Sequence, residues 1–511
     1  MPVRLFLERV GGFLPAAVAL TLPLAFLPAA ADTYILLRAS IAIAGACLGV
    51  GIALLIPPAA GLGNLRLPLA AAAGAAALAF AFSVSWPLSL AGSYTRYESL
   101  PMRLAYLGLM ATSVWLLRRR VERDAVVAAF VFGTTVACLE ALQQAFANVS
   151  FRPDGNLGNA NLLAALITMA VPLAIDRARR GGLFVGPWAA SVVAMAAGLV
   201  VTTSRSGALG VIAGCGALLV LAVPRRFTVP LAAASAAAVG GGVLFILLSP
   251  LRALNDDPAG LRLHLWQDGL RMFAARPLTG WGEETTGLAF GKFLTQDYAG
   301  QVTFDRVHSG VLDVAVTQGV LGLAALGWVL VVLFRAAWAK REERDVPALA
   351  AALVGYSVWV FFNFDWAPAT AAFWLLAGTL WSSISLSPPG ERAGVRGDKE
   401  VWRAAGAAGL VAAAVVFAVL PPLADTWYLQ GRADLAVRAD PLQAQYHWAL
   451  GTLPELQKAS DLGETDPGLY VQLGDAYLRE GDRVNARRAY ERALEIDPYY
   501  TPAAQRLASL A

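Results

Sequence analysis

The sequence predicts an all-α fold: a polytopic bundle of membrane-spanning helices followed by a smaller helical domain at the C-terminal end. Hydrophobic residues make up 57% of the 511 residues and charged residues only 15%, and the mean hydropathy is +0.57. The apolar residues are grouped in runs long enough to cross a bilayer, which requires about 20 helical residues. Residues 467–500 instead carry small and aromatic residues at the spacing of a two-helix repeat.

Thirteen apolar runs are predicted to be membrane spans. They lie near residues 10–30, 33–56, 67–90, 101–117, 124–147, 158–175, 183–203, 206–222, 227–249, 309–334, 346–363, 366–386 and 403–420. The first run follows Arg4 and Arg9, as in a signal peptide, but it continues without a clear cleavage site. We therefore expect it to be retained as the first helix of the bundle.

The distribution of Lys and Arg predicts the orientation of the chain. If every run crosses once, seven basic segments, including the N-terminus, fall on one side of the membrane. Lys and Arg accumulate on the cytoplasmic side, so we expect these segments there. The opposite side receives the long polar segment and the tail. The sequence thus predicts a transmembrane domain over residues 1–420 with a large periplasmic loop over 250–308, and a periplasmic domain over 421–511.

The charge and the cysteines argue against several classes of site. The net charge is +4, and the basic residues lie in connecting segments, so no nucleic-acid partner is needed to explain them. Cys47, Cys138 and Cys215 fall within apolar runs, where cysteine behaves as a small hydrophobic residue. We expect neither a disulfide nor a cysteine metal site.

The tail carries the pattern of a tetratricopeptide repeat. The matching positions within residues 467–500 are Tyr470, Leu473, Gly474, Tyr477, Ala486, Tyr490, Ala493 and Pro498. Small residues in this repeat let two antiparallel helices pack closely, and the proline ends the second helix. Such a repeat binds a protein partner or another part of the same chain, and a structural spacer is an equally good interpretation.

A polar turn is predicted between the seventh and eighth apolar runs, where residues 202–207 read Thr-Thr-Ser-Arg-Ser-Gly. An arginine at membrane depth costs about 2.5–3.5 kcal/mol unless it faces a cavity or an anion. The Arg205 guanidinium, flanked by the hydroxyls of Ser204 and Ser206, suits a phosphate ligand. The alternative is an arginine that reaches to the interface, but Arg205 falls on the side where positive charge is normally avoided.

The loop supplies three further candidates. Arg262 and Trp266 are four residues apart on a predicted helix that follows the Asp-Asp-Pro sequence at residues 256–258, so they share one face and could hold an anionic or sugar ligand. A surface helix with solvated charges explains this spacing equally well. Arg276 begins the Arg-Pro-Leu-Thr-Gly turn of residues 276–280, whose proline and glycine are explained by turn chemistry alone.

His308 is the candidate proton acceptor. It is one of three histidines and precedes the apolar run 309–334, shortly after Asp305 and Arg306. An unperturbed imidazole has a pKa of about 6.5, which suits proton transfer near neutral pH. The alternative is a histidine that merely solvates the start of the helix. His264 and His447 have no comparable surroundings in the sequence.

Together these residues resemble the O-antigen ligase and polymerase superfamily. The resemblance rests on an Arg-x3-Leu pattern, Arg205 to Leu209, and a His-x10-Gly pattern, His308 to Gly319. Supporting segments are residues 158–164, 276–280 and 318–322, and the whole resemblance runs from about residue 156 to residue 337. Each motif alone is weakly specific, but their order around a large loop makes the set more specific.

The resemblance implies a GT-C-like membrane glycosyltransferase that uses a glycan on undecaprenyl pyrophosphate, without a metal or other cofactor, at the outer face of the bacterial inner membrane. It casts His308 as the base that activates the acceptor hydroxyl and Arg205 as a pyrophosphate ligand. Arg262 and Arg276 become candidate second ligands, and Ser204, Ser206 and Trp266 complete the expected substrate site. Membrane lipids surround such a protein.

Three acceptors stay open: the lipid A core for a ligase, a second lipid-linked repeat for a polymerase, and a protein Ser or Thr for an O-oligosaccharyltransferase. The His-x10-Gly pattern favours the ligase, whereas the tetratricopeptide tail, a possible site for a protein partner, shifts some weight toward the other two. A transporter or flippase of lipid-linked glycan is the alternative from another class. Transporters often contain paired broken helices in two repeats, and the sequence shows no such pairing.

Overall fold

The computed structural model of the chain describes residues 2–148, 152–182, 184–249, 251, 259–297, 304–385 and 399–510. All regular secondary structure in these residues is helical, which confirms the predicted fold class. The Asp-Asp-Pro sequence at residues 256–258, expected to start a helix, lies outside the described residues.

In the described residues the bundle is built from fourteen helices. They are α1 (Pro2–Val10), α2 (Leu14–Leu24), α3 (Leu36–Leu55), α4 (Arg66–Ala81), α6 (Leu100–Leu116), α7 (Arg120–Ala147), α8 (Ala160–Arg179), α9 (Val185–Thr202), α10 (Arg205–Ala222), α11 (Thr228–Leu248), α14 (Gly310–Ala339), α15 (Val346–Phe361), α16 (Ala367–Ser385) and α17 (Lys399–Leu429). The loop between α11 and α14 carries further helices of its own. Short 3-10 turns at Gly11–Phe13, Gly63–Leu65 and Arg225–Phe227 precede α2, α4 and α11.

Each of the thirteen predicted spans falls on one of these helices. Among the described residues, ten helical segments are long and apolar enough to cross a membrane, and α6 and α15 are shorter apolar helices; the remaining run lies on α16. The run predicted over 67–90 is too long, because α4 ends at Ala81 and a separate helix, α5 (Trp86–Ala91), follows it. Pro87 occupies the first turn of α5, where proline costs no backbone hydrogen bond, whereas in the interior of a helix it would remove one.

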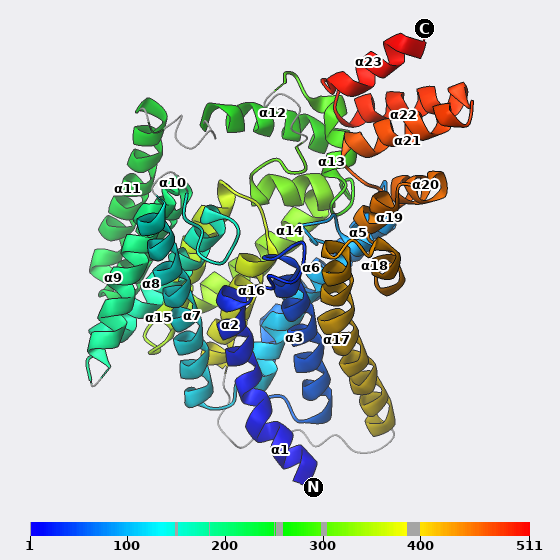
Figure 1. The fold of residues 1–511 in the computed structure, drawn as a ribbon. Coiled ribbons are helices and arrows are strands. Elements are labelled where there is room, and N and C mark those ends of the chain that lie inside the picture. Colours follow the sequence, from blue (N-terminus) through cyan, green and yellow to red (C-terminus); the bar gives the residue numbers. More distant parts are fainter. Residues whose placement is uncertain are drawn as a thin grey trace.

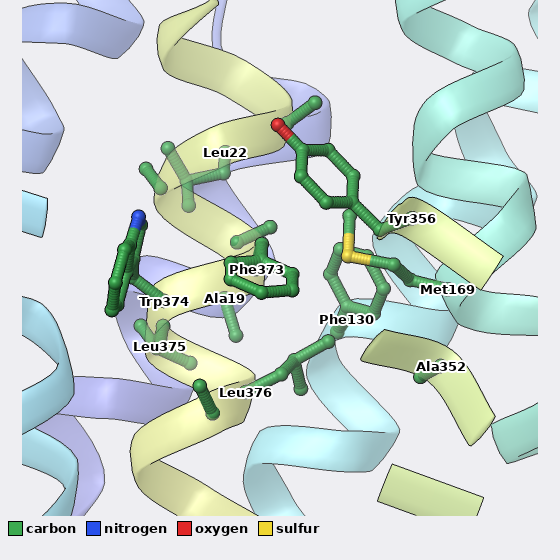
Figure 2. Packing of buried hydrophobic residues seen from close by; sticks show 14 of the residues in the cluster. Ala19, Leu22, Phe130, Met169, Ala352, Tyr356, Phe373, Trp374, Leu375 and Leu376 are labelled. Atoms are coloured by element: carbon green, nitrogen blue, oxygen red, sulfur yellow. The ribbon is translucent and has the colours of Figure 1, made fainter. Parts of the chain in front are cut away.

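The core lies between α2, α7, α8, α15 and α16. Figure 2 shows Leu22, Phe130, Met169, Tyr356 and Phe373 directed toward one another from these five helices. The span on α8 is buried over most of its length, whereas none of the span on α11 is buried inside the protein. The bundle is therefore organised around α8, and α11 stands at its periphery (Figure 1).

Small residues let α8, α10 and α15 approach closely. A β-carbon on Gly210 of α10 would lie 2.8 Å from the carbonyl oxygen of Gly355 on α15, and one on Gly355 would lie 2.8 Å from the carbonyl oxygen of Thr168 on α8. Such contacts are typical of helices that pack in membranes, where small residues allow the backbones to meet. This packing brings the start of α10 and the end of α15 together at one end of the bundle.

The loop helices and the tail lie at that same end. The loop contains α12 (Ala259–Ala275), α13 (Thr286–Ala289) and a 3-10 turn (Phe290–Phe293), and the tail contains α18 (Ala433–Ala439), α19 (Ala444–Leu450), α20 (Leu453–Leu462), α21 (Pro467–Arg479), α22 (Arg483–Ile496) and α23 (Thr501–Leu510). In Figure 1 α12, α13, α21, α22 and α23 are at the top, α18, α19 and α20 lie lower at the right, and α1 is at the bottom. The arrangement agrees with a loop and tail that face the same compartment.

The tail is joined to the bundle both by the chain and by packing. α17 runs from Lys399 through Pro421 and Pro422 to Leu429, so a continuous helix crosses the proposed domain boundary at residues 420 and 421. A β-carbon on Gly291 of the loop would lie 2.3 Å from the carbonyl oxygen of Ile496 on α22, and Leu88 and Leu288 belong to the hydrophobic cluster of the tail. The tail thus rests directly on the loop.

Candidate functional site

Arg205 stands at the start of α10, where a break between two membrane helices exposes it. α9 ends at Thr202, and Thr203 adopts a left-handed conformation with φ 51°. The Ser204 hydroxyl caps α10 by accepting a hydrogen bond from the backbone N–H of Gly207 at 3.3 Å. The start of a helix offers unpaired N–H groups and the positive end of the helix dipole, which together favour an anion.

A cavity of about 130 Å³ lies beside this helix start, and we name it the arginine cavity. Its lining residues are Arg152, Asn161, Thr203, Arg205, Ser206, Leu209, Val243, Ile246, Leu247, Arg262, Leu263, Trp266 and Phe362. Four of the residues predicted from the sequence therefore meet here: Arg205, Ser206, Arg262 and Trp266. They come from α10 and α12, which the chain separates by the whole of α11.

Hydrogen bonds to the backbone fix the three guanidinium groups at the cavity wall. Arg205 donates to the carbonyl oxygen of Leu251 at 2.5 Å, and Arg262 donates to that of Phe362. Arg152 donates through Nε to the carbonyl oxygen of Thr202 at 2.8 Å. Three fixed guanidinium groups around one cavity favour a polyanionic ligand, because each offers a planar fork of donors to phosphate or carboxylate oxygens.

The two candidate serines have different surroundings. Ser206 lines the cavity, and its hydroxyl accepts a hydrogen bond from the side-chain amide of Asn363 at 2.9 Å. Ser204 stands behind the lining, where its hydroxyl donates to the side-chain oxygen of Asn161 at 2.8 Å. That same oxygen accepts from Arg152 at 3.0 Å, so Ser204 supports the cavity wall through Asn161.

His308 is connected to the arginine cavity through Trp266. The indole N–H of Trp266 donates to the backbone carbonyl of His308 at 3.4 Å, while the Trp266 side chain lines the cavity. The imidazole packs edge-to-face on Phe364, with 5.2 Å between ring centroids. His308 has a φ of 55°, a left-handed conformation that non-glycine residues adopt only where the surroundings impose it.

A second cavity, of about 150 Å³, lies at the start of α14, and we name it the α6–α14 cavity. Gly310 and Val311, the second and third residues after His308, line it together with Arg103 and Asp365. The rest of its wall comes from largely apolar faces of α4, α6, α14, α15 and α16. Residues close to His308 in the chain therefore line a mostly apolar cavity, whereas Trp266, which bonds to its backbone, lines the cationic one.

The two glycine motifs of the sequence interlock at the break in α14. Gly319 leaves the helical conformation, with φ 69° and ψ −163°, and the backbone groups released there bond to the 276–282 turn. The N–H of Val320 donates to the carbonyl of Pro277 at 2.8 Å, and the N–H of Trp281 donates to the carbonyl of Val316 at 2.9 Å. A β-carbon on Gly319 would lie 2.2 Å from the carbonyl oxygen of Leu278, which explains the requirement for glycine.

The polypeptide that contains both Arg205 and His308 can be compared with known proteins. Residues 190–327 match the family model described as O-antigen ligase. This O-antigen ligase match extends from α9 to the middle of α14, so it includes Arg262, Trp266 and Gly319 as well. It indicates a function of the O-antigen ligase or polymerase type, carried out by an enzyme similar to membrane glycosyltransferases. Residues 467–500 match the model described as tetratricopeptide repeat, as the sequence pattern predicts, and no curated protein matches the chain.

One candidate within the O-antigen ligase match lies away from the arginine cavity. Arg276 follows the end of α12, whereas Arg262 is near its start, and a helix of this length separates them by about 20 Å. The Arg276 guanidinium lies over the ring of Trp281, 4.4 Å from its centroid, and donates to the carbonyl oxygen of Phe82 at 3.5 Å. The structure therefore corrects the expectation that Arg276 is a second ligand beside Arg205: spacing along α12 keeps it out.

Two residues that line the cavity were not predicted from the sequence. Arg152 and Asn161 precede and begin α8, and the bond between their side chains at 3.0 Å joins them at the cavity wall. The sequence does offer a signal for Arg152, because it is a basic residue in a segment on the side of the membrane where few Lys and Arg residues are expected. Asn161 belongs to the 158–164 segment of the family resemblance, but nothing in the sequence indicated its partner.

A buried ion pair and a buried hydrogen bond fix the backbone just before His308. Arg306 pairs with Glu284, and both side chains are 1% exposed. The backbone N–H of Val307 donates to the carboxylate of Asp313 at 3.1 Å. Because two consecutive residues are held in this way, the left-handed conformation of His308 is imposed by its neighbours.

A second set of buried charges lies beneath, around Arg103. Its guanidinium is 2.6 Å from the carboxylate of Asp365 and 3.2 Å from that of Glu283, and Glu283 also accepts from the Gln318 amide at 2.6 Å. Burial raises the pKa of the Glu98 carboxyl to about 7, although Arg103 acts in the opposite direction. These contacts connect the loop with α6, α14 and the segment after α15 next to the site.

Replacing Arg306 by methionine is expected to lower the free energy of unfolding by about 3–5 kcal/mol, because the change leaves the Glu284 carboxylate buried without its cation. Fluorescence of the 14 tryptophans during denaturation of the purified protein measures this change. The double variant R306M/E284Q is expected to recover most of the loss, since no unpaired charge then stays buried.

The control for this prediction is Arg432→Met. Arg432 also pairs with an aspartate, Asp434 of the tail at 3.3 Å, but both side chains are more than half exposed, at 55% and 51%. Loss of a surface pair changes stability by about 0.5 kcal/mol or less. Equal effects of R306M and R432M would show that burial does not give the Arg306–Glu284 pair a special role.

Proposed function

We propose that the protein transfers a glycan from undecaprenyl pyrophosphate to the hydroxyl group of a lipid-anchored acceptor, as an O-antigen ligase does. The observation that carries this proposal is the arginine cavity, in which Arg152, Arg205 and Arg262 meet at the start of α10 with His308 next to them through Trp266. A diphosphate is the polyanion that such a set of guanidinium groups suits.

In the proposed reaction, the acceptor oxygen attacks the anomeric carbon of the glycan. A new carbon–oxygen bond forms, and the bond between that carbon and the phosphate oxygen breaks. His308 accepts the proton of the hydroxyl and later releases it to water. The lipid diphosphate leaves with increased negative charge, which Arg152, Arg205 and Arg262 stabilise because their positions are already fixed before the reaction.

A groove along α10 and α11 supports a lipid-linked donor. Leu209 lines the arginine cavity, and Ala213, Ala217 and Leu221, on the same face of α10, line an adjoining apolar groove of about 710 Å³. On α11, Gly240 belongs to this groove and Val243, one turn further along, to the cavity. An isoprenoid chain that follows this face would hold its diphosphate at the start of α10.

The α6–α14 cavity supports an acceptor that also carries a lipid. Its wall is apolar over most of α4, α14 and α16, with Arg103 and Tyr106 at one end, a combination suited to an amphiphile rather than to an extended peptide. A second lipid-linked repeat fits this description as well as a lipid A core does, so a polymerase is the second candidate. A protein Ser or Thr has less support from this wall.

We further propose that the protein lies in the inner membrane with its N-terminus in the cytoplasm, so that residues 250–308 and the domain over 421–511 face the periplasm. The site would then be reached from the outer face. The tetratricopeptide repeat, formed by α21 and α22, would bind a protein partner through a face that α22 does not use for its contact with the loop.

The proposal is tested by incubating the purified protein with glycan on undecaprenyl pyrophosphate and, separately, lipid A core, a second lipid-linked repeat or a Ser/Thr peptide. Mass spectrometry identifies the product. We expect transfer to lipid A core, with or without EDTA, because no step requires a metal ion. Product with a second repeat alone would favour the polymerase. Movement of intact lipid-linked glycan across the membrane of vesicles that contain the protein, with no product from any acceptor, would contradict an enzymatic function and favour a flippase.

A further inference from the structure

An ion pair lies next to His308 that the reaction described above does not use. Arg96, in the segment between α5 and α6, donates to both carboxylate oxygens of Asp305, at 2.6 Å through Nε and at 3.3 Å through Nη2. Both side chains are partly buried, with 21% and 28% exposed. Asp305 precedes His308 by three residues, so the pair connects a distant segment to the candidate base.

Phe364 is shared by this ion pair and by His308. The Arg96 guanidinium lies over the Phe364 ring at 4.8 Å and over the Trp366 ring at 4.4 Å, and the His308 imidazole packs on Phe364 at 5.2 Å. Stacking on aromatic faces and a two-point bond to a carboxylate are both features of arginine that lysine lacks. Arg96 is therefore held in one orientation beside His308.

The backbone around Arg96 is also fixed. Thr95 and Tyr97 have φ values of 70° and 58°, in the left-handed region that non-glycine residues occupy only when their surroundings require it. The Trp366 indole donates to the carbonyl oxygen of Thr95 at 3.1 Å, and the Tyr94 hydroxyl donates to Asp425 of α17 at 2.8 Å. Two non-glycine residues held in this region on either side of Arg96 indicate that its position matters.

The charge of Asp305 reaches His308. Burial raises the pKa of the Asp305 carboxyl, but the charge of Arg96 and its hydrogen bond, with a further contribution from His308, hold that pKa below its ordinary value. Asp305 is therefore ionised throughout the pH range in which an imidazole titrates. A carboxylate close to an imidazole stabilises the protonated ring.

The other charged groups on the elements around His308 have partners of their own. On the segment after α15, Asp365 is 2.6 Å from Arg103. On the loop, Arg306 pairs with Glu284, and on α14, Asp313 accepts from the backbone of Val307. On α12, Arg262 lies one turn before Trp266 and donates to the carbonyl of Phe362. Its positive charge disfavours the protonated form of the His308 ring, which the carboxylate of Asp305 favours.

We propose that Arg96 and Asp305 form a positioning pair for His308, in which the Asp305 carboxylate stabilises the imidazolium. Arg96 fixes the orientation of that carboxylate and partly neutralises its negative charge. This inference rests on the proposed function, in which the His308 imidazole takes the proton of the acceptor hydroxyl. Neither member of the pair touches the reacting atoms. Each acts through the ring, and the two therefore have opposite effects on its protonation.

The test compares Asp305→Asn with Arg96→Met in the full-length protein. A base must be unprotonated, so kcat/KM for transfer rises with pH through the pKa of His308. D305N removes the carboxylate and leaves Arg96, so this rise is expected to move to lower pH by about one unit. R96M leaves Asp305 without its cation, so the rise is expected to move to higher pH by a similar amount. D305E is expected to restore the wild-type profile.

The ring itself can be titrated without any measurement of activity. The chain has three histidines, so NMR of protein labelled at the histidine ring gives three histidine signals, and H308Q identifies the signal of His308. The pKa of this signal is expected to fall in D305N and to rise in R96M. Arg271→Met, which removes another arginine from an aspartate of the loop, is the matched control and is expected to leave the signal unchanged.

The outcomes separate the two proposals. If both variants lose activity while the pH profile and the His308 titration stay as in the wild type, the pair is merely structural and this inference is wrong, although the proposed function stands. A shift of both variants in the same direction also contradicts it. If H308Q transfers glycan at the wild-type rate, His308 is not the base and this inference fails with that role, whatever the titration shows. Absence of transfer by the wild-type protein to every acceptor would instead contradict the proposed function.

Discussion

Replacement of His308 by alanine is expected to lower the rate of glycan transfer by a factor of about 10²–10⁴, the usual contribution of a positioned general base. The acceptor hydroxyl would then lose its proton to water alone. Because Arg152, Arg205 and Arg262 are unchanged, the donor should still bind, so kcat falls while KM for the lipid-linked glycan changes little. Single-turnover transfer with purified protein measures the effect.

His264→Ala is the matched control for this prediction. His264 is an exposed residue of α12, two residues after Arg262, and its replacement should leave transfer within a factor of about two. The thermal unfolding of H308A should also be recorded, since His308 adopts a left-handed conformation. A native rate in H308A would contradict its role as the base, and a stable protein with no donor binding would point to a role in binding instead.

The sequence predicts the architecture because hydrophobicity and helical length are strong, local signals. Every predicted span falls on a helix, and the repeat over 467–500 is confirmed by its family match. The predicted run over 67–90 is wrong at its end, because α4 stops at Ala81 and Pro87 lies in the first turn of a separate helix, α5. Ser83, between the two helices, packs tightly against Gly282 of the loop. Boundaries of helices depend on such contacts, and periodicity alone does not contain them.

The arginine cavity was predictable in part. Arg205 was identified by its place in the membrane, and the spacing of Arg262 and Trp266 predicted the common face that now lines the cavity. Arg276 shows the limit of this reasoning, since a motif identifies a residue in the sequence but does not say how far the intervening helix, α12, carries it from the cavity. Arg152 shows the opposite case, a residue outside the motifs that does line the cavity. The segment that carries it reaches the cavity through the packing of α8 against α9 and α10.

The buried charges could not be predicted at all. Arg103 lies within an apolar run, where an arginine is costly without a partner, but its partners Glu283 and Asp365 come from the loop and from the segment after α15. The Arg96–Asp305 pair likewise joins residues that are separated by eight helices of the chain. Pairing of distant charges depends on how the helices are arranged, and that arrangement follows from the core.

Replacement of Arg205 by methionine is expected to lower kcat/KM for transfer by a factor of about 10²–10³, the usual effect of removing one fixed donor that stabilises developing charge. Arg205 combines a guanidinium with the positive start of α10, so the leaving diphosphate would lose its strongest contact. R205K should recover part of the rate, because lysine supplies the charge without the planar fork. R152M is expected to follow R205M, as both line the same cavity.

Arg276→Met is the control that decides whether the cavity or the motif identifies the donor site. Both arginines belong to the O-antigen ligase match, but Arg276 stacks on Trp281 and does not line the cavity. We expect R276M to transfer glycan within a factor of about two of the wild type. If R276M is as damaging as R205M while R152M is neutral, the motif and not the cavity identifies the donor site, because a guanidinium that lines the cavity would then have no bearing on the reaction.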